Sequence, residues 1–466
     1  MKDVEQWTPE GSERHQSRLG RQDWLAIAFV VALALLFLPI VVWKTVWLGQ
    51  GDVQVIFRAG WAIWTGYPLY QVTDHHGWTY HYPPTLALFM GPFADPLPGY
   101  TRPFWAFPYT AAVVVWYGLN VLCLFLSSHL WASALERYRP IAGAQQGFLH
   151  GPWLLRLGPF LALLPFVGVT LVRGQLEAFL LLLVVSFVIL YVENRVISSS
   201  FVFALATAIK VFPIAFAIFP LLRRDGKFLL WAAGWCVLLL IGLPAICLGP
   251  EATLDLYRDM WTEHLAGMLS GSMSTRVASE VSPGAYANVS VGSVLARIAA
   301  GKAFFQSSLP FWATAIQYLF DTAVVAAVTI LGRGGFWNLR ERQPARGYPL
   351  LIAGAVLLAA MPLMLQTAKP NYITLAMPLM AVFMVEAWQR VGQQVVTRSM
   401  IGWIVIAWIS VLLVELRWDW VRVVGPVTWA LLILGPASLL LIREVSIEPT
   451  AAAAQMRRSS LQVPGE

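Results

Sequence analysis

The segment Trp24–Trp47, with the sequence WLAIAFVVALALLFLPIVVWKTVW, decides the fold of this chain. It contains one charged residue, Lys44, and is about as long as a helix that crosses a ~30 Å hydrocarbon layer. Similar segments recur to the end of the sequence, which excludes a lone cleaved signal peptide. Hydrophobic residues make up 58% of the 466 residues, charged residues make up 12%, and the mean hydropathy is +0.64. A soluble fold cannot bury this much apolar surface, so we predict a multi-pass membrane protein.

The apolar segments predict about twelve spans when each span needs roughly 17 to 25 residues. They lie at 24–47, 83–97, 104–130, 157–172, 176–191, 201–222, 228–248, 310–331, 348–365, 372–388, 400–416 and 424–442. The predicted fold class is therefore an all-α polytopic membrane protein. Residues 1–23 form a predicted cytoplasmic segment, 24–443 a membrane domain, and 444–466 a cytoplasmic, disordered tail.

The charge distribution predicts the orientation. Arg14, Arg18 and Arg21 precede the first span, so we expect the N-terminus in the cytoplasm. Counting spans from there places the basic stretches 223–227, 333–346 and 389–398 and the C-terminal tail inside, and two large loops, 51–82 and 249–309, outside. The loop 131–156 disagrees, because the count places its three arginines outside. Either this loop is an exception or one short span is miscounted.

Cysteine and charge usage exclude other classes of protein. The three cysteines, Cys123, Cys236 and Cys247, lie in or beside apolar runs and have neither disulfide nor zinc-site spacing. The net charge of +7 comes from basic residues dispersed between the spans. We therefore predict the lipid bilayer as a partner and no nucleic acid.

Several motifs occur in a specific order. Asp52 follows the first span and precedes AGWAIWTGYPLY (59–70) and YHYPPTLALFMGPFADPLP (80–98). RGQLEAFLLLLV (173–184), ALATAIKVFPIAFAIFPLLRR (204–224) and NVSVGSVLAR (288–297) come later. The ordered set resembles glycosyltransferase family 87, the polyprenol-phosphate-mannose-dependent membrane transferases. The resemblance implies a GT-C-like bundle, with 24–443 as its catalytic domain and two large outer loops.

The resemblance also implies a reaction. An acceptor hydroxyl, on a glycolipid or glycan, attacks the anomeric carbon of a polyprenyl-phosphate sugar, and the configuration inverts. The expected sugar is mannose, and the expected location is the extracytoplasmic face of the plasma membrane. A carboxylate acts as general base, and cations offset the charge on the leaving phosphate. Asp52 matches the family's acid and is the predicted base. The alternative, which is compatible with this role, is that Asp52 caps an interfacial helix.

Basic residues are candidates for binding the donor phosphate. Lys210 lies within an apolar span, where a cation is costly and usually faces a cavity or a partner; the alternative is an internal ion pair with Glu177. Lys369 lies at the outer edge between two spans, and it could instead extend to the interface. Arg276 lies in the second outer loop. Arg58 lies on the predicted interfacial helix and faces either lipid headgroups or substrate.

The remaining predicted substrate contacts are polar or aromatic. Tyr80, His81 and Tyr82 are predicted to line the sugar pocket, since aromatic rings pack against a pyranose face. Gln175 marks either a helix end in the cavity or a packing point. Asn371 stands where the family commonly has a histidine, and Glu177 where it commonly has an asparagine.

The histidines of the first outer loop do not predict a metal site. His75, His76 and His81 match no established ligand spacing. The sequence predicts neither a metal nor another cofactor. One rival interpretation is a secondary transporter, which would also have about twelve spans and intramembrane charges. Another is a non-catalytic lipid-handling membrane protein. The sequence lacks the repeated halves that many transporters have, so we favour the transferase.

Overall fold

The computed structural model describes residues 21–49, 51–139, 152–265, 288–302, 309–336, 347–365 and 369–391, and the single residues 402, 405 and 409. Within these ranges the chain is helical, and an isolated bridge between Thr73 and Thr79 is the only β pairing. The predicted all-α class is therefore confirmed for the described part. The predicted spans at 400–416 and 424–442 lie almost wholly outside it, as do the N-terminal 20 residues and the tail.

Six helical segments of the described part are long and apolar enough to cross a membrane. Within a helix the backbone amides and carbonyls bond to one another, which is what a hydrocarbon layer requires. They comprise α1 (Arg21–Val42) continued by η1 (Trp43–Trp47), α4 (Tyr109–Tyr138), α10 (Gly226–Val237) continued by η5 (Leu238–Gly242) and α11 (Leu243–Leu248), α16 (Phe311–Phe336), α17 (Gly347–Met364), and η8 (Pro370–Ala376) continued by α18 (Met377–Val391).

A seventh candidate span is broken. Helices α5 (Pro152–Ala162) and α6 (Leu164–Arg173) meet at 69°. Pro165 stands in the first turn of α6, where its missing N–H is tolerated but where it cannot continue α5. The shorter apolar helices are α7 (Glu177–Val192), α8 (Val196–Ile209), η4 (Phe212–Ala217) continued by α9 (Ile218–Leu222), and α15 (Val291–Ala300).

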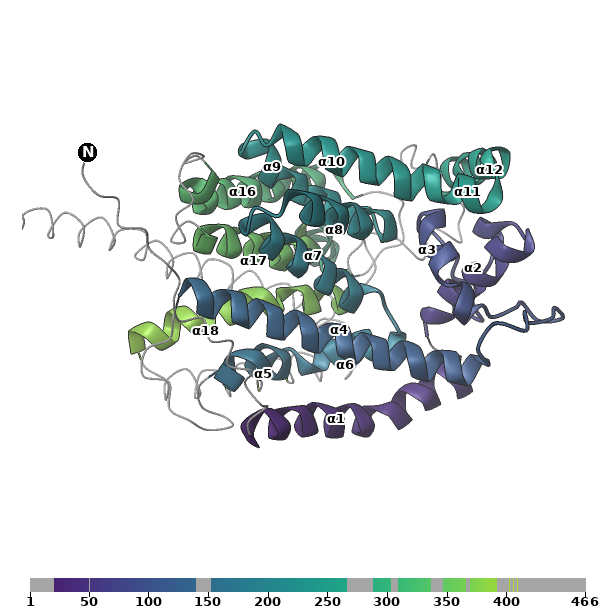
Figure 1. The fold of residues 1–466 in the computed structure, drawn as a ribbon, viewed down its shortest axis with the longest axis horizontal. Helices are drawn as coiled ribbons and strands as arrows, with labels where there is room; N and C mark the ends of the chain where they lie inside the picture. The colour runs from purple at the N-terminus through teal and green to yellow at the C-terminus, as the bar shows by residue number, and fades with distance from the viewer. Residues whose placement is uncertain are drawn as a thin grey trace, which may run out of the picture.

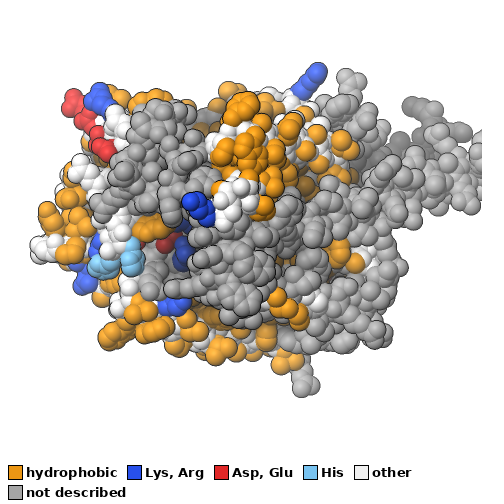
Figure 2. All heavy atoms as spheres, turned by 180° about the vertical axis from the view of Figure 1, so that it is seen from behind, with side chains coloured by type: hydrophobic (Ala, Val, Ile, Leu, Met, Phe, Trp, Pro, Cys, Tyr) orange, Lys and Arg blue, Asp and Glu red, His pale blue; other side chains and the backbone are white. Residues whose placement is uncertain are grey.

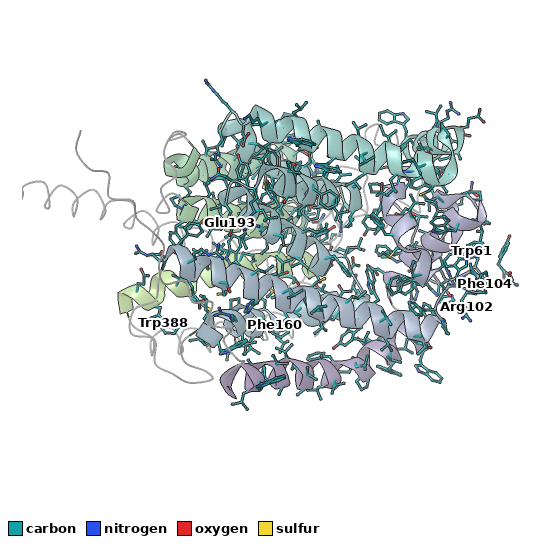
Figure 3. The ribbon with its side chains drawn as sticks, viewed as in Figure 1. Trp61, Arg102, Phe104, Phe160, Glu193 and Trp388 are labelled. Carbon is teal, nitrogen blue, oxygen red and sulfur yellow. The ribbon has the colours of Figure 1, made fainter. Side chains whose placement is uncertain are left out.

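The long helices lie roughly along one axis, and the chain runs along this axis in both senses, so the molecule has two distinct ends (Figure 1). At one end, α2 (Val53–Thr65), α3 (Pro84–Phe89) and α12 (Pro250–Met260) gather around the loop after α1; we call it the Asp52 end. At the other, the Arg139 end, Arg139 lies 3.9 Å from Glu386 of α18. Figure 3 places Glu193 and Trp388 toward the Arg139 end, and Arg102 and Phe104 at the opposite extreme.

The predicted span at 83–97 is wrong. This stretch forms α3, which has six residues, and the 3₁₀ turn η3 (Gly91–Phe93). Six helical residues rise only about 9 Å, far less than the hydrocarbon thickness. Pro83, Pro84 and Pro92 limit the helix here, because proline lacks an N–H and restricts the residue before it.

The predicted span at 201–222 is also wrong as a single crossing. Helix α8 begins near Glu193, at the Arg139 end, and its last residue precedes Lys210, which bonds to Glu177 at the start of α7. The chain then reverses through η4 (Phe212–Ala217) and α9 (Ile218–Leu222). It returns to the Arg139 end, where Arg223 donates to Asn194 at 3.3 Å. Two short arms therefore replace one span.

These two corrections remove the disagreement in the charge distribution. With 83–97 no longer a span, α4 carries the chain directly from the Asp52 end to the Arg139 end. The arginines of the loop that follows then lie at the same end as Arg223: Arg137 pairs with Glu193, and Arg156 pairs with Glu136 at 2.7 Å. The basic loop 131–156 is therefore not an exception, because one span before it was miscounted.

The core lies along α17 and α18. In these two segments, 89% and 83% of the residues in the most apolar window are buried, against 11% in the first span. Leu36 of α1, Leu230 of α10 and Leu319 of α16 are between 69% and 76% exposed. Exposed leucines on long apolar helices are expected where a helix faces lipid, so α1, α10 and α16 form the outer surface of the bundle.

Candidate active site

Asp52 lies where several helix ends meet. It separates η1 from α2, and the turn between α6 and α7 and the start of η8 lie against it. The space-filling view shows histidines at this end of the molecule, beside basic and acidic side chains in a recess (Figure 2). Helix breaks expose backbone and polar side chains, so this is the natural place for a polar site in an apolar bundle.

The Asp52 carboxylate is held by three polar side chains. Its Oδ2 accepts a hydrogen bond from Nε2 of Gln175, and Nη1 of Arg173 and Nζ of Lys369 each lie 3.8 Å from it. The side chain remains 24% exposed. A carboxylate that is oriented, charge-compensated and accessible has the features of a general base.

Asp52 does not cap α2. It stands at the N-cap position, but its backbone is already helical (φ −62°, ψ −17°) and its side chain accepts no hydrogen bond from the helix. A capping aspartate normally has extended backbone angles and accepts from the second or third backbone N–H of its helix. The capping alternative is therefore wrong, because the carboxylate faces Gln175, Arg173 and Lys369 and not the backbone of α2.

Gly174 brings Gln175 close to Asp52. It has φ +64°, in the left-handed region, and ends α6. A Cβ atom here would lie 2.6 Å from Cβ of Val53, the residue after Asp52, so only glycine fits. Trp116 of α4 donates to the Gly174 carbonyl at 2.8 Å. The sequence Gly-Gln thus marks both the helix end and the close packing that were predicted as alternatives.

Lys210 forms the internal ion pair. Its Nζ lies 3.0 Å from Oε1 of Glu177, and the glutamate side chain is fully buried. The ammonium also lies over the rings of Tyr372 and Tyr82, at 4.4 and 5.2 Å from their centroids. Oε2 of Glu177 is buried and has no hydrogen-bond partner among the described residues. Lys210 is therefore neutralised, which leaves Arg173 and Lys369 as the cations nearest to Asp52.

Asn371 lies in the first turn of η8, two residues after Lys369. It is 1% exposed, and its backbone carbonyl accepts from the Thr170 hydroxyl at 3.2 Å. Neither amide atom of its side chain has a partner among the described residues. A buried amide without partners is costly. Its role as a substrate contact remains a prediction.

Arg58 and Tyr80 have structural contacts. Arg58 is 4% exposed; it donates to the Thr73 carbonyl, and its Nε lies 3.8 Å from Asp95. The Tyr80 hydroxyl donates to the Pro83 carbonyl at 2.8 Å, and its side chain is fully buried. These contacts place both side chains within the packing of the first outer loop, and the substrate contacts predicted for them remain predictions.

The rings of His81 and Tyr82 stack on each other, with His81 on the exposed side and Tyr82 on the buried side. His81 is exposed and lies 4.5 Å from the Tyr82 ring, which covers Lys210. Within the described residues, no group of three or more potential metal ligands occurs. Arg276, the remaining predicted contact, lies outside the described residues.

The sequence reasoning missed Arg173 and Trp78. Arg173 begins the quoted motif RGQLEAF and ends an apolar helix, and a basic residue immediately before Gly-Gln was the available signal. Trp78 contacts Lys369, whose Nζ lies 3.5 Å from its ring centroid. Nothing local in the sequence indicated this pairing, since the two residues are almost 300 positions apart.

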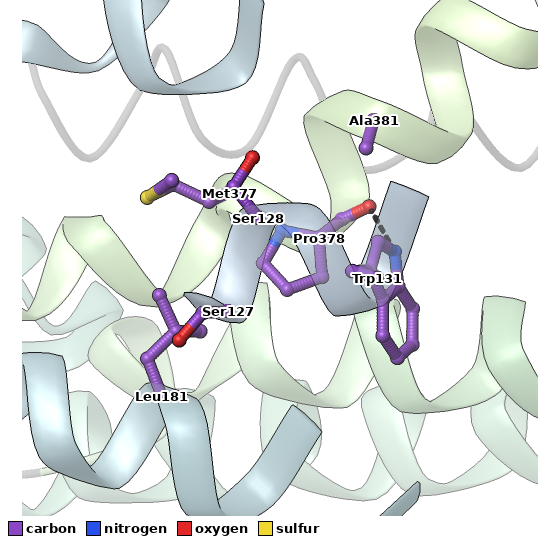
Figure 4. Close-up of a pocket in the computed structure, with 7 residues that line it drawn as sticks. All are labelled: Ser127, Ser128, Trp131, Leu181, Met377, Pro378 and Ala381. Atoms are coloured by element: carbon purple, nitrogen blue, oxygen red, sulfur yellow. Dashed lines mark hydrogen bonds between the residues drawn. The ribbon is translucent and has the colours of Figure 1, made fainter. Parts of the chain in front are cut away.

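A narrow cavity lies away from this cluster. Ser127, Ser128 and Trp131 of α4 line it together with Leu181, Met377, Pro378 and Ala381 (Figure 4). The indole N–H of Trp131 donates to the Pro378 carbonyl at 3.1 Å. The lining contains no ionisable side chain, so this is a packing gap between α4, α7 and α18 and not a candidate site.

A known protein family matches this chain in sequence over a stretch that includes the last four motifs. The sequence model of glycosyltransferase family 87 matches residues 80–364, more than half of the chain. No curated protein matches the sequence significantly. The crystal structure of ArnT from Cupriavidus metallidurans bound to undecaprenyl phosphate is similar, with 13% sequence identity and a TM-score of 0.40. That match covers 96% of this chain and 82% of that chain.

Proposed function

Since this chain belongs to glycosyltransferase family 87, we propose that it transfers a hexose from a polyprenyl-phosphate sugar to an acceptor hydroxyl. The chain is a multi-pass membrane glycosyltransferase. The observation that carries the finer proposal is the Asp52 carboxylate, which is partly exposed and held by Gln175 between the cations Arg173 and Lys369.

The proposed reaction is a single displacement. The acceptor oxygen forms a bond to the anomeric carbon while the bond from that carbon to the phosphate oxygen breaks, so the configuration inverts. Asp52 accepts the proton of the acceptor hydroxyl, and the electron pair of the broken bond leaves with the phosphate. Arg173 and Lys369 lie close enough to Asp52 to face the same substrate, and they offset the charge of the leaving phosphate.

The donor and acceptor follow from the family and the surroundings of the site. We propose mannose as the sugar, with His81 and Asn371 as its polar contacts and a glycolipid or glycan as acceptor. The recess opens at the Asp52 end, among helices with lipid-facing leucines. A donor with a polyprenyl tail in the bilayer and a headgroup at the surface fits this position.

Transfer itself tests the proposal. Purified protein in vesicles is incubated with radiolabelled polyprenyl-phosphate-mannose and a panel of cell-envelope lipids, with polyprenyl-phosphate-glucose as the matched donor control. We expect label in an acceptor lipid from the mannosyl donor. Label transferred only from glucose would overturn the choice of sugar. Donor that binds or crosses the vesicle without transfer would overturn the proposed reaction.

The proposed orientation places the Asp52 end outside the cell. The catalytic unit is 24–443, and both termini and the stretches 223–227 and 333–346 are cytoplasmic, in agreement with the basic residues at the Arg139 end. The exposed His76 and the cytoplasmic Lys227 provide matched positions for single cysteines in a cysteine-free background. An impermeant thiol reagent should label position 76 in intact cells, and position 227 only after lysis. The reverse pattern would invert the topology.

A further inference from the structure

We propose that Trp78 is a positioning residue of this site, whose indole ring holds the ammonium group of Lys369 beside Asp52. This inference rests on the proposed function, and it adds a residue that neither the motifs nor the family resemblance assigns. Two distances support it. Nζ of Lys369 lies 3.5 Å from the centroid of the Trp78 ring and 3.8 Å from Oδ2 of Asp52.

The tryptophan ring restricts a side chain that is otherwise flexible. A lysine ammonium ends a four-carbon stem and is attracted to the electron-rich face of an indole, the most favourable ring for this contact. Lys369 is 22% exposed, so water and the bilayer surface compete for its charge. A ring on one side and a carboxylate on the other leave the ammonium few alternatives.

The loop that carries Trp78 is itself held in one conformation. Oδ1 of Asp74 accepts from the backbone N–H groups of His76 and Trp78, both at 2.8 Å. The backbone N–H of Asp74 donates to the Trp78 carbonyl at 3.0 Å. Gly77, with φ +87°, allows the turn between them. Asp74 therefore fixes the backbone of Trp78 from both directions.

The same loop is attached to the helix that follows Asp52. The backbone N–H of His75 donates to the side chain of Gln54 at 3.1 Å, and Arg58 donates to the Thr73 carbonyl. Gln54 and Arg58 are buried residues of α2. Asp52 and Trp78 thus belong to one connected unit, whereas Lys369 comes from the distant connection between α17 and η8. The ring joins these two parts of the molecule at the carboxylate.

This arrangement affects the proposed chemistry through charge. In the proposed reaction the ammonium held beside Asp52 also offsets the charge of the leaving phosphate. Release of Lys369 from the ring would therefore slow the transfer step, so kcat would fall while KM changes little. General destabilisation of the fold would instead lower the amount of active protein.

The test compares Trp78→Leu with Trp78→Phe. A cation–π contact of moderate strength corresponds to about a three- to thirtyfold fall in kcat for the leucine variant. We also expect KM of the leucine variant to change little, and Trp78→Phe to retain most of the wild-type behaviour. Trp105→Leu is the control, because Trp105 lies at the same end but contacts Trp64 instead. A kcat in Trp78→Leu equal to that of wild type would overturn the proposal.

A second readout does not depend on transfer. An amine-reactive reagent modifies Lys369 at a rate that mass spectrometry can measure, with Lys227 on α10 as internal reference. We expect Lys369 to react several-fold faster in Trp78→Leu than in wild type, and at nearly the wild-type rate in Trp78→Phe. Equal rates in all three proteins would refute the role of Trp78. If wild type shows this protection but no transfer, the proposed function fails and the positioning contact stands.

Discussion

Asp52→Asn should abolish sugar transfer while the protein remains folded and able to bind the donor. Asparagine preserves the size of the side chain and its bond with Gln175 but cannot accept the acceptor's proton. Loss of a general base typically lowers a rate by on the order of 10²–10⁴. Because Asp52 makes no capping hydrogen bond to α2, the substitution removes no cap, and a fall of this size cannot come from helix stability. The measurement is single-turnover transfer, with donor binding determined separately.

The chain offers a matched control for this substitution. Asp225 is a true cap, since its side chain accepts from the backbone N–H of Phe228 at 3.0 Å, and it lies at the opposite end of the molecule. Asp225→Asn should leave transfer nearly unchanged, because asparagine caps a helix about as well as aspartate. If Asp52→Asn keeps more than about a tenth of wild-type turnover, another acid is the base. The next acids in the sequence-based prediction are Asp74, Glu177 and Glu263, of which Glu177 fits least, because it is fully buried and paired with Lys210.

The sequence predicted the long, uniformly apolar helices best. An uninterrupted apolar run that is as long as the hydrocarbon layer is thick has few possible structures other than a membrane-spanning helix. The helices α1, α4 and α16 were therefore recognised. The errors fell at 83–97 and 201–222, where proline interrupts apolar runs of adequate length. Hydropathy shows that a segment is apolar. It does not show whether the segment crosses the lipid or is buried within the protein. The reversal at 201–222 is seen in the contacts at its two ends: Lys210 bonds to Glu177, and Arg223 bonds to Asn194.

The candidate site was predicted in part. Asp52 was found through its match to the family's acid, and Gln175 and Lys369 through their positions at the ends of apolar segments. The structure brings these three together. Residue type and position also selected Arg58 and Tyr80, which contact the surrounding loop. A sequence gives the position of a side chain along a helix and not its direction. Trp78 was missed because its partner comes from a distant part of the chain.

Substitution of Lys210 distinguishes a role in stabilising the fold from a role in catalysis. Lys210→Met should destabilise the fold strongly, because it leaves the fully buried carboxylate of Glu177 without its counter-charge. Removal of one partner of a buried pair costs about 3–5 kcal/mol, whereas replacement of both partners is often neutral. We therefore expect Lys210→Met to lower the unfolding midpoint of the protein in lipid nanodiscs, and Lys210→Met/Glu177→Gln to restore most of it.

Activity in the double variant then decides what the pair does. If Lys210 serves only to neutralise Glu177, the double variant should transfer sugar at nearly the wild-type rate with the wild-type donor requirement. A stable double variant that needs much more donor would instead show that Lys210 binds the phosphate, and Glu177 would be the residue that holds it until the donor arrives. The geometry favours the first outcome. Lys210 is enclosed by Glu177 and two tyrosine rings, whereas Arg173 and Lys369 are partly exposed beside Asp52, where the phosphate would leave.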